Sequence, residues 1–191
     1  MSNSAVKRPS IRQLYADQTK AAILESAQYL FATKGYTEAG VRDIAARANV
    51  NPALITRYFG SKIALFEAAL EESLDVNFFT DIDKQGFGYQ VAELFCLATE
   101  GETLVVPALI LAAGDSAARE VAVRLLKDQI EAPLIAWFGS SDGEDRAAQL
   151  IAMVTGFFTF RLMLPLDAMK DQPSAAMQQW LADSLQEIID R

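Results

Sequence analysis

Asparagine, proline and cationic residues gather between residues 49 and 62, where their types and spacing suit contact with a polyanion. Asn51 can cap a helix with its side chain. Pro52 suits the first helical position, because the N–H that proline lacks has no helical partner there. The sequence therefore predicts a short helix over 52–59 that Gly60 ends. A helix of about eight residues can lie across the major groove of DNA with its first turn facing the base edges.

Lys62 directly follows Ser61, the predicted N-cap of a further helix. A positive charge in the first turn of a helix opposes the helix dipole, at a cost of up to about 1 kcal/mol. Lys62 fits this position if a phosphate binds there, held by its ammonium group and by the N-terminal amides of the helix. The alternative is a solvated surface charge. Arg42 and Arg57 are further candidates for contact with a polyanion, with the same alternative.

Charge is distributed unevenly along the chain, whose net charge is −8. Residues 1–66 hold nine Lys and Arg against four Asp and Glu, a net charge of +5. The remaining residues hold 8 basic and 21 acidic side chains, a net charge of −13. A basic N-terminal region on an acidic body indicates a polyanionic partner for the N-terminal region, although chance unevenness is the alternative.

Helical periodicity continues through the rest of the sequence, so we expect an all-α fold of about nine helices. The predicted N-terminal helices span 17–34, 41–48 and 52–59, and a fourth begins at Lys62 and continues through Leu74. The later ones span 86–98, 102–113, 116–138, 143–164 and 174–189. Pro133 is expected to kink the helix over 116–138. The turn over 49–51 has the length that a helix-turn-helix unit requires.

Several classes of protein are excluded by composition. The chain has no histidine, which removes the usual general base and the commonest metal ligand, and Cys96 is its only cysteine. We expect no catalytic site, no metal and no cofactor, and hence no enzyme. The longest apolar run, 104–113, contains Pro107 and is too short to span a bilayer. No signal peptide is visible, so a cytoplasmic protein without membrane contact is expected.

The stretch from Thr19 to Leu70 resembles the DNA-binding domain of the TetR family of transcriptional regulators. The resemblance lies in the type and spacing of residues along the whole stretch: Ile23, Leu24, Ala27, Leu30, Phe31, Gly35, Tyr36, Val41, Arg42, Asp43, Ile44, Ala45, Ala48, Val50, Phe59, Ser61, Lys62 and Leu65. It implies a helix-turn-helix DNA-binding domain over 13–62 and a ligand-sensing and dimerisation domain over 63–191. The preceding residues, 1–12, are expected to form a flexible basic arm, which either reaches a DNA groove or is a solvated tail.

The resemblance further implies a repressor that binds a palindromic double-stranded DNA operator as a homodimer. Dimerisation would use the last two helices, and a small-molecule inducer would release the DNA by moving the fourth helix. The implied DNA-binding residues are Arg42, Asn51, Pro52, Ala53, Leu54, Thr56, Arg57, Tyr58 and Lys62. This sequence departs from the family at two positions. The family usually has tyrosine where this chain has Thr56, and threonine or serine where it has Gly40. Leu54 and Tyr58 have an alternative role, packing within the N-terminal domain.

Aromatic residues are frequent in the C-terminal part, where an apolar pocket between helices is expected. The candidate pocket residues are Phe79, Phe95, Leu109, Trp137, Phe157 and Arg161. For the aromatic residues the alternative is ordinary core packing, and for Arg161 it is a salt bridge or an interface. The alternative function is a helical carrier of small molecules without operator function, which would survive deletion of residues 1–66.

Overall fold

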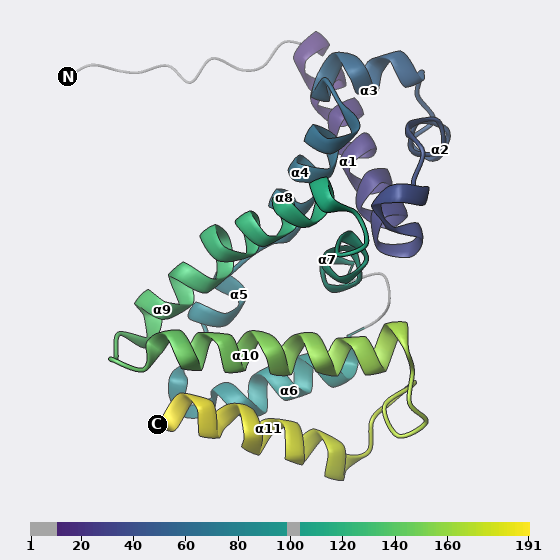
Figure 1. The fold of residues 1–191 in the computed structure, drawn as a ribbon. Helices are drawn as coiled ribbons and strands as arrows, with labels where there is room; N and C mark the ends of the chain where they lie inside the picture. Colours follow the sequence, from purple (N-terminus) through teal and green to yellow (C-terminus); the bar gives the residue numbers. More distant parts are fainter. Residues whose placement is uncertain (1–10, 99–103) are drawn as a thin grey trace, which may run out of the picture.

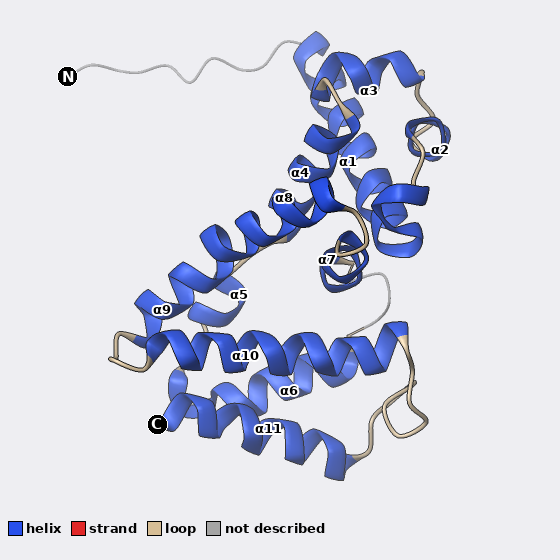
Figure 2. Ribbon diagram, viewed as in Figure 1, coloured by secondary structure: helices blue, strands red, loops and turns tan. Residues whose placement is uncertain are grey.

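The computed structural model describes residues 11–98 and 104–191, and all regular structure within these two ranges is helical (Figure 2). Residues 1–10 of the predicted basic arm lie outside the described residues. Residues 11 and 12 already belong to a helix, which corrects the predicted extent of the arm. No helix in the described ranges is long and apolar enough to cross a membrane.

The N-terminal helices end close to where their capping residues predict. They are α1 (Ile11–Glu38), α2 (Val41–Arg47), α3 (Pro52–Phe59) and α4 (Lys62–Ser73). Helix α1 begins earlier than the predicted residue 17. Gly35 interrupts its helical geometry with φ of +76°, a left-handed value that glycine adopts without strain. The last turn of α1 is thereby redirected toward α2.

The C-terminal part contains α5 (Asn77–Thr80), α6 (Phe87–Leu97), α7 (Val105–Ala112), α8 (Ser116–Leu126), α9 (Ala132–Phe138), α10 (Gly143–Phe158) and α11 (Ala175–Asp190). The single turn of α5 was not predicted. Helices α8 and α9 are joined by a π-turn over Lys127–Glu131, in which the Ala132 N–H donates to the Lys127 carbonyl five residues back. A π-turn is wider than a turn of α-helix, which makes room for the ring of Pro133. The kink that was expected at Pro133 is therefore a π-turn that separates α8 from α9.

Two apolar cores lie along an elongated molecule (Figure 1). The first is built by α1–α4 together with α7 and α8. The second is built by α6, α9, α10 and α11. Leu65, Phe66, Ala69 and Leu70 on α4 are buried in the first core, which therefore continues beyond residue 62. Helix α7 touches both cores, because Ala108 and Ala112 enter the first and Val106 the second.

Two buried arginines hold the ends of helices in the second core. Arg146 donates through Nε to the Ile188 carbonyl at 2.8 Å and through Nη2 to the Ile189 carbonyl at 2.6 Å. Arg161 donates through Nη2 to the carbonyls of Cys96 at 2.8 Å and Ala98 at 3.0 Å. A cation at the C-terminal end of a helix is favourable, because the unpaired carbonyls carry partial negative charge.

Replacing Arg161 with methionine is expected to lower the free energy of unfolding by about 2 to 3 kcal/mol, because buried carbonyls lose charged donors. Chemical denaturation at a fixed protein concentration measures the change. Arg119, exposed on α8, provides the matched control, and Arg119→Met should change stability by less than about 0.5 kcal/mol. Equal stability of the two variants would show that Arg161 holds nothing in place.

Candidate nucleic-acid interface

Helix α3 is held on the surface by one buried residue and two well-formed ends. The side chain of Asn51 accepts a hydrogen bond from the Ala53 N–H at 2.9 Å, and Pro52 occupies the first turn. Gly60 ends the helix with φ of +79°. Ile55 is the buried residue of α3 and fixes it against the first core. The remaining turns of α3 face outward at the far end of the molecule from α10 and α11 (Figure 1).

Eight of the nine implied DNA-binding residues, all except Lys62, fall into two groups in the structure. Asn51, Pro52, Ala53, Thr56 and Arg57 are exposed, as is Arg42 on α2. Leu54 and Tyr58 are half-buried and pack against the first core, as their alternative role requires. The exposed group presents small and polar side chains on the first turn of α3 with a cation on its second.

Arg42 and Arg57 have no ion-pair partner within the described ranges, which leaves both guanidinium groups available. Other cations of the N-terminal region are engaged within the chain. The Arg47 guanidinium lies 3.6 Å from the centre of the Tyr29 ring, and Lys34 lies 3.6 Å from a carboxylate oxygen of Asp43. The sequence pattern did not separate the engaged cations from the available ones.

Lys62 is accounted for by contacts inside the protein. Its ammonium group donates to the Thr37 carbonyl at 3.2 Å and lies 4.5 Å from the centre of the Tyr36 ring. The lysine therefore caps the end of α1 and is attracted to an aromatic face. These contacts give the cation in the first turn of α4 a role within the protein, and contact of Lys62 with a phosphate stays a prediction.

The turn between α2 and α3 contains a feature that the sequence analysis missed. Asn49 has φ of +53°, a left-handed conformation that asparagine tolerates better than most residues. The neighbouring Val50 N–H donates to the Ala45 carbonyl at 2.9 Å, which closes the turn. The position of asparagine between two predicted helices is the signal that could have revealed this conformation.

An apolar cavity of about 290 Å³ lies on the inner side of α7, between the two cores. Phe79, Phe95 and Leu109 line it, as expected for a pocket. Its other lining residues are Ser73, Leu74, Asp75, Phe78, Val105, Val106, Leu126, Ile130, Leu134, Leu150, Ile151, Val154, Thr155 and Phe158. The volume is close to the lower end of the range of about 300–1,000 Å³ typical of small-molecule sites.

Three expected pocket residues do not line this cavity. Trp137 packs against Phe87, and the Lys84 ammonium lies 4.6 Å from the centre of its ring. Phe157 is buried in the second core, and Arg161 donates hydrogen bonds to the carbonyls at the end of α6. Helical periodicity gives the inward faces of these helices but not which inward residues border an empty space.

Comparison with known proteins gives two family matches, one in the N-terminal and one in the C-terminal part of the chain. Residues 23–69 match the model of bacterial regulatory proteins of the tetR family. Residues 85–189, more than half of the chain, match the model of the tetracyclin repressor-like C-terminal domain. The second match covers the helices that line the cavity from α6 onward.

The relatives found by sequence are similar mainly in the N-terminal region. The chain is 46% identical over 55 residues to the HTH-type transcriptional repressor Rv3405c of Mycobacterium tuberculosis, which is 29% of this chain and 29% of that protein. It is 33% identical over 63 residues to the HTH-type transcriptional activator FasR of Mycolicibacterium smegmatis, 33% of this chain and 29% of that protein. The matched stretch thus spans less than a third of the length of these curated relatives.

The fold as a whole is shared with solved structures. A putative TetR-family transcriptional regulator from Rhodococcus sp. superposes with a TM-score of 0.71 at 16% identity, covering 91% of this chain and 100% of that one. The likeness concerns the fold, since the identity is low. The two family matches show that this chain belongs to the TetR family of bacterial regulatory proteins.

Proposed function

We propose that this protein is a cytoplasmic, DNA-binding transcriptional repressor that binds a palindromic operator as a homodimer and is released by a small molecule. The observation that carries the proposal is the outward face of α3, where Asn51 caps the first turn and Arg57, beside Thr56, has no ion pair with any described residue. Ala53 and Pro52 leave this first turn uncrowded, so it can approach base edges closely. Arg42 lies on the adjacent helix as a second cation for the duplex.

Homodimerisation through α10 and α11 is supported by the exposed residues of these two helices. Gly156 lies in the interior of α10, where glycine costs about 1 kcal/mol relative to alanine. A Cβ atom added at Gly156 would meet nothing within 4 Å, so packing within the protomer does not require glycine there. Close approach of a second protomer gives a reason for it. Ala152 and Phe160 share the exposed side of this segment, and Trp180 on α11 is 54% exposed.

Release by a small molecule is supported by the place of the cavity between the two cores. Leu74, next to the end of α4, lines the cavity, and Leu70 one turn earlier is buried in the first core. Leu109 lines the cavity from α7, whose Ala112 packs in the first core. A ligand that displaces either helix would shift the two N-terminal domains of the dimer, which carry α3. This shift requires that the ligand prefers the state that does not bind DNA.

Repression is proposed because Rv3405c, which is 46% identical to this chain over 55 residues, is named a repressor. FasR, which is similar over the same N-terminal region, is named an activator, so similarity in this region alone does not fix the sign of regulation. The other candidate function, a carrier without operator function, needs only the cavity and leaves the exposed face of α3 without a role.

Salt dependence of DNA binding separates these two functions. The logarithm of the association constant should fall linearly with the logarithm of salt concentration, with a slope of about −0.9 for each phosphate contacted. We expect a total slope of several units, measured by fluorescence anisotropy with duplex DNA. Binding that is absent at low salt, or that ignores salt, would favour the carrier.

Replacing Ala152 with arginine is expected to convert the dimer into a monomer, because a long cation would be buried where two α10 helices approach. Light scattering on the purified protein would report half the molar mass, and circular dichroism would report unchanged helix content. Ala136→Arg, at an exposed position on α9, is the matched control and should stay dimeric. An Ala152→Arg protein that remains a dimer would place the interface elsewhere.

A further inference from the structure

The cavity between the cores is lined by few polar side chains, and one of these is a carboxylate. Among its described lining residues, fourteen side chains are apolar and the remaining three are Ser73, Asp75 and Thr155. None of them is lysine, arginine, asparagine, glutamine or tryptophan, so no lining side chain offers an N–H donor. The Ser73 hydroxyl already donates to the Ala69 carbonyl at 2.9 Å. The Thr155 hydroxyl is thus the side-chain donor that remains for a ligand.

An anionic ligand is poorly matched to such a lining. Burying a carboxylate or sulfonate without a cation or several donors costs several kcal/mol, and one hydroxyl does not offset this cost. The Asp75 carboxylate would also repel it. The lining therefore selects against anions, although the cavity has the size and apolar character of a small-molecule site.

Asp75 supplies the charge of the cavity. Its Oδ1 atom accepts a hydrogen bond from the Asn77 N–H at 2.9 Å, which fixes the carboxylate at the start of α5. No ion pair of Asp75 occurs within the described ranges, so its negative charge is uncompensated there. The residue is exposed, which places it where the cavity opens to solvent.

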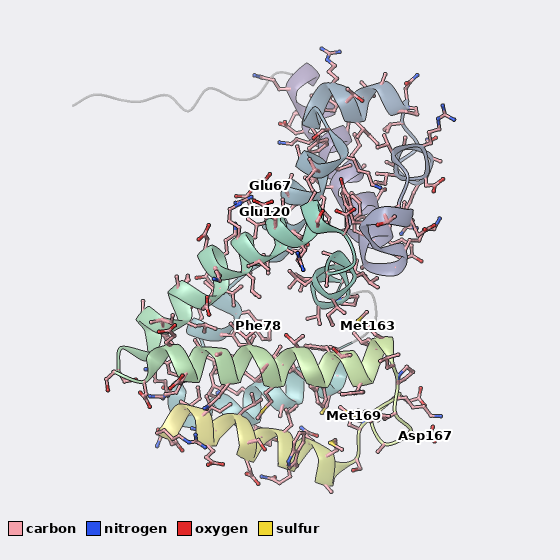
Figure 3. The ribbon with its side chains drawn as sticks, viewed as in Figure 1. Glu67, Phe78, Glu120, Met163, Asp167 and Met169 are labelled. Atoms are coloured by element: carbon pink, nitrogen blue, oxygen red, sulfur yellow. The ribbon has the colours of Figure 1, made fainter. Side chains whose placement is uncertain are left out.

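Aromatic residues line the same cavity as this carboxylate, among them Phe78 and Phe79. Phe78 belongs to α5, lines the cavity (Figure 3) and is 39% exposed. It stacks on Phe95 with ring centres 5.8 Å apart and meets Phe79 edge-on at 5.0 Å. The face of an aromatic ring attracts a cation, and the attraction strengthens as the cation loses its water. Residues 67–191 carry a net charge of −13, which concentrates cations around this part of the molecule.

We propose that the cavity binds an apolar monocation, an organic ammonium compound whose charge lies at Asp75 and Phe78 and whose apolar body fills the space among the aliphatic side chains. The proposal deepens the proposed function, on which it rests only in taking this cavity as the effector site. The carboxylate and the aromatic face set the preference for positive charge. The apolar walls of α7 and α10 set the preference for a hydrocarbon body of modest size.

The test uses three ligands that share one body and differ in charge: 4-phenylbutylamine, 4-phenylbutanol and 4-phenylbutanoate. The amine is fully protonated at pH 7, as a lysine side chain is. Isothermal titration calorimetry on the full-length, DNA-free protein measures each affinity. We expect the amine to bind at least tenfold more tightly than the alcohol, and the acid to bind more weakly than either.

Asp75→Asn is the decisive variant. Its amide oxygen can keep the cap on the Asn77 N–H, so α5 should be preserved while the charge is lost. We expect it to lower the affinity for the amine about tenfold and to leave that for the alcohol unchanged. Asp81→Asn, at an exposed aspartate that does not line the cavity, controls for net charge and should bind all three ligands as the wild type does. Leu109→Trp, which fills the cavity, should abolish binding of the amine.

The inference is overturned if the acid binds as tightly as the amine, if none of the three ligands binds, or if Asp75→Asn keeps the preference for the amine. Because the titrations contain no DNA, their outcome is independent of operator binding. A protein that prefers the amine but binds no DNA would refute the proposed function alone. A protein that binds DNA but shows no such preference would refute this inference alone.

Discussion

Arg57→Ala is expected to weaken binding to the operator by about a hundredfold or more while leaving the fold intact. An arginine that contacts a base or phosphate contributes about 1–3 kcal/mol, and a dimer loses this contact in both of its heads. Arg57 is exposed on the second turn of α3 and has no ion pair in the described part of the chain, so its loss removes no contact that supports the protein. Anisotropy titrations at constant salt measure the change.

Arg119→Ala is the matched control for Arg57→Ala, because it removes the same charge from an exposed position on α8. Its operator affinity should stay within about twofold of the wild type. Thermal unfolding of both variants should coincide with that of the parent protein. If the two variants bound the operator equally, α3 would not be the helix that reads DNA.

Gly88→Ala is expected to have the largest effect on stability, a loss of about 3 kcal/mol or more. A Cβ atom at Gly88 would overlap the Ala182 carbonyl oxygen and would lie 2.8 Å from the Gln186 backbone nitrogen. Both are backbone atoms of α11, so the contact can be relieved only by moving the helix. The Gly88 N–H also donates to the Gln186 side chain at 2.9 Å, and this bond would be strained as α6 and α11 separate.

Chemical denaturation at fixed protein concentration measures this loss, since the stability of a dimer depends on concentration. Gly114→Ala is the control, because the nearest atom to its added Cβ is the Leu111 carbonyl oxygen at an ordinary 3.7 Å. We expect that variant to remain within about 0.5 kcal/mol of the wild type. A Gly88→Ala protein of normal stability would mean that α6 and α11 are further apart than the structure shows.

Local capping rules made the bounds of α3 predictable from the sequence. Asn51, Pro52 and Gly60 fix the ends of α3 through bonds to near neighbours, so the predicted span of 52–59 is confirmed residue for residue. The all-α fold and the family were likewise predicted. Packing between distant segments was less accessible. The contact of Lys62 with Thr37 was not predicted, because it joins residues 25 positions apart in the chain.

The residues that line the cavity were also hard to predict, because the cavity forms between segments that are distant in the sequence. Aromatic content pointed to Phe79 and Phe95 but also to Trp137 and Phe157, since periodicity shows which side of a helix is inward and not what lies opposite. Asp75 was missed because an exposed carboxylate next to a helix end is common on any surface. Arg161 was considered as a ligand contact, an ion-pair partner or an interface residue, whereas its partners are backbone carbonyls that no side-chain pattern displays.

Selection of bound duplexes from a random DNA library tests the central claim most directly, because it examines reading by α3 and symmetry of the dimer in one measurement. The account predicts an enriched inverted repeat whose half-site centres lie about 34–36 Å, one turn of B-DNA, or a multiple of that distance apart. It further predicts that Arg57→Ala loses the preference at defined positions of each half-site. Enrichment of no sequence, or of a single site without an inverted copy, would contradict the account.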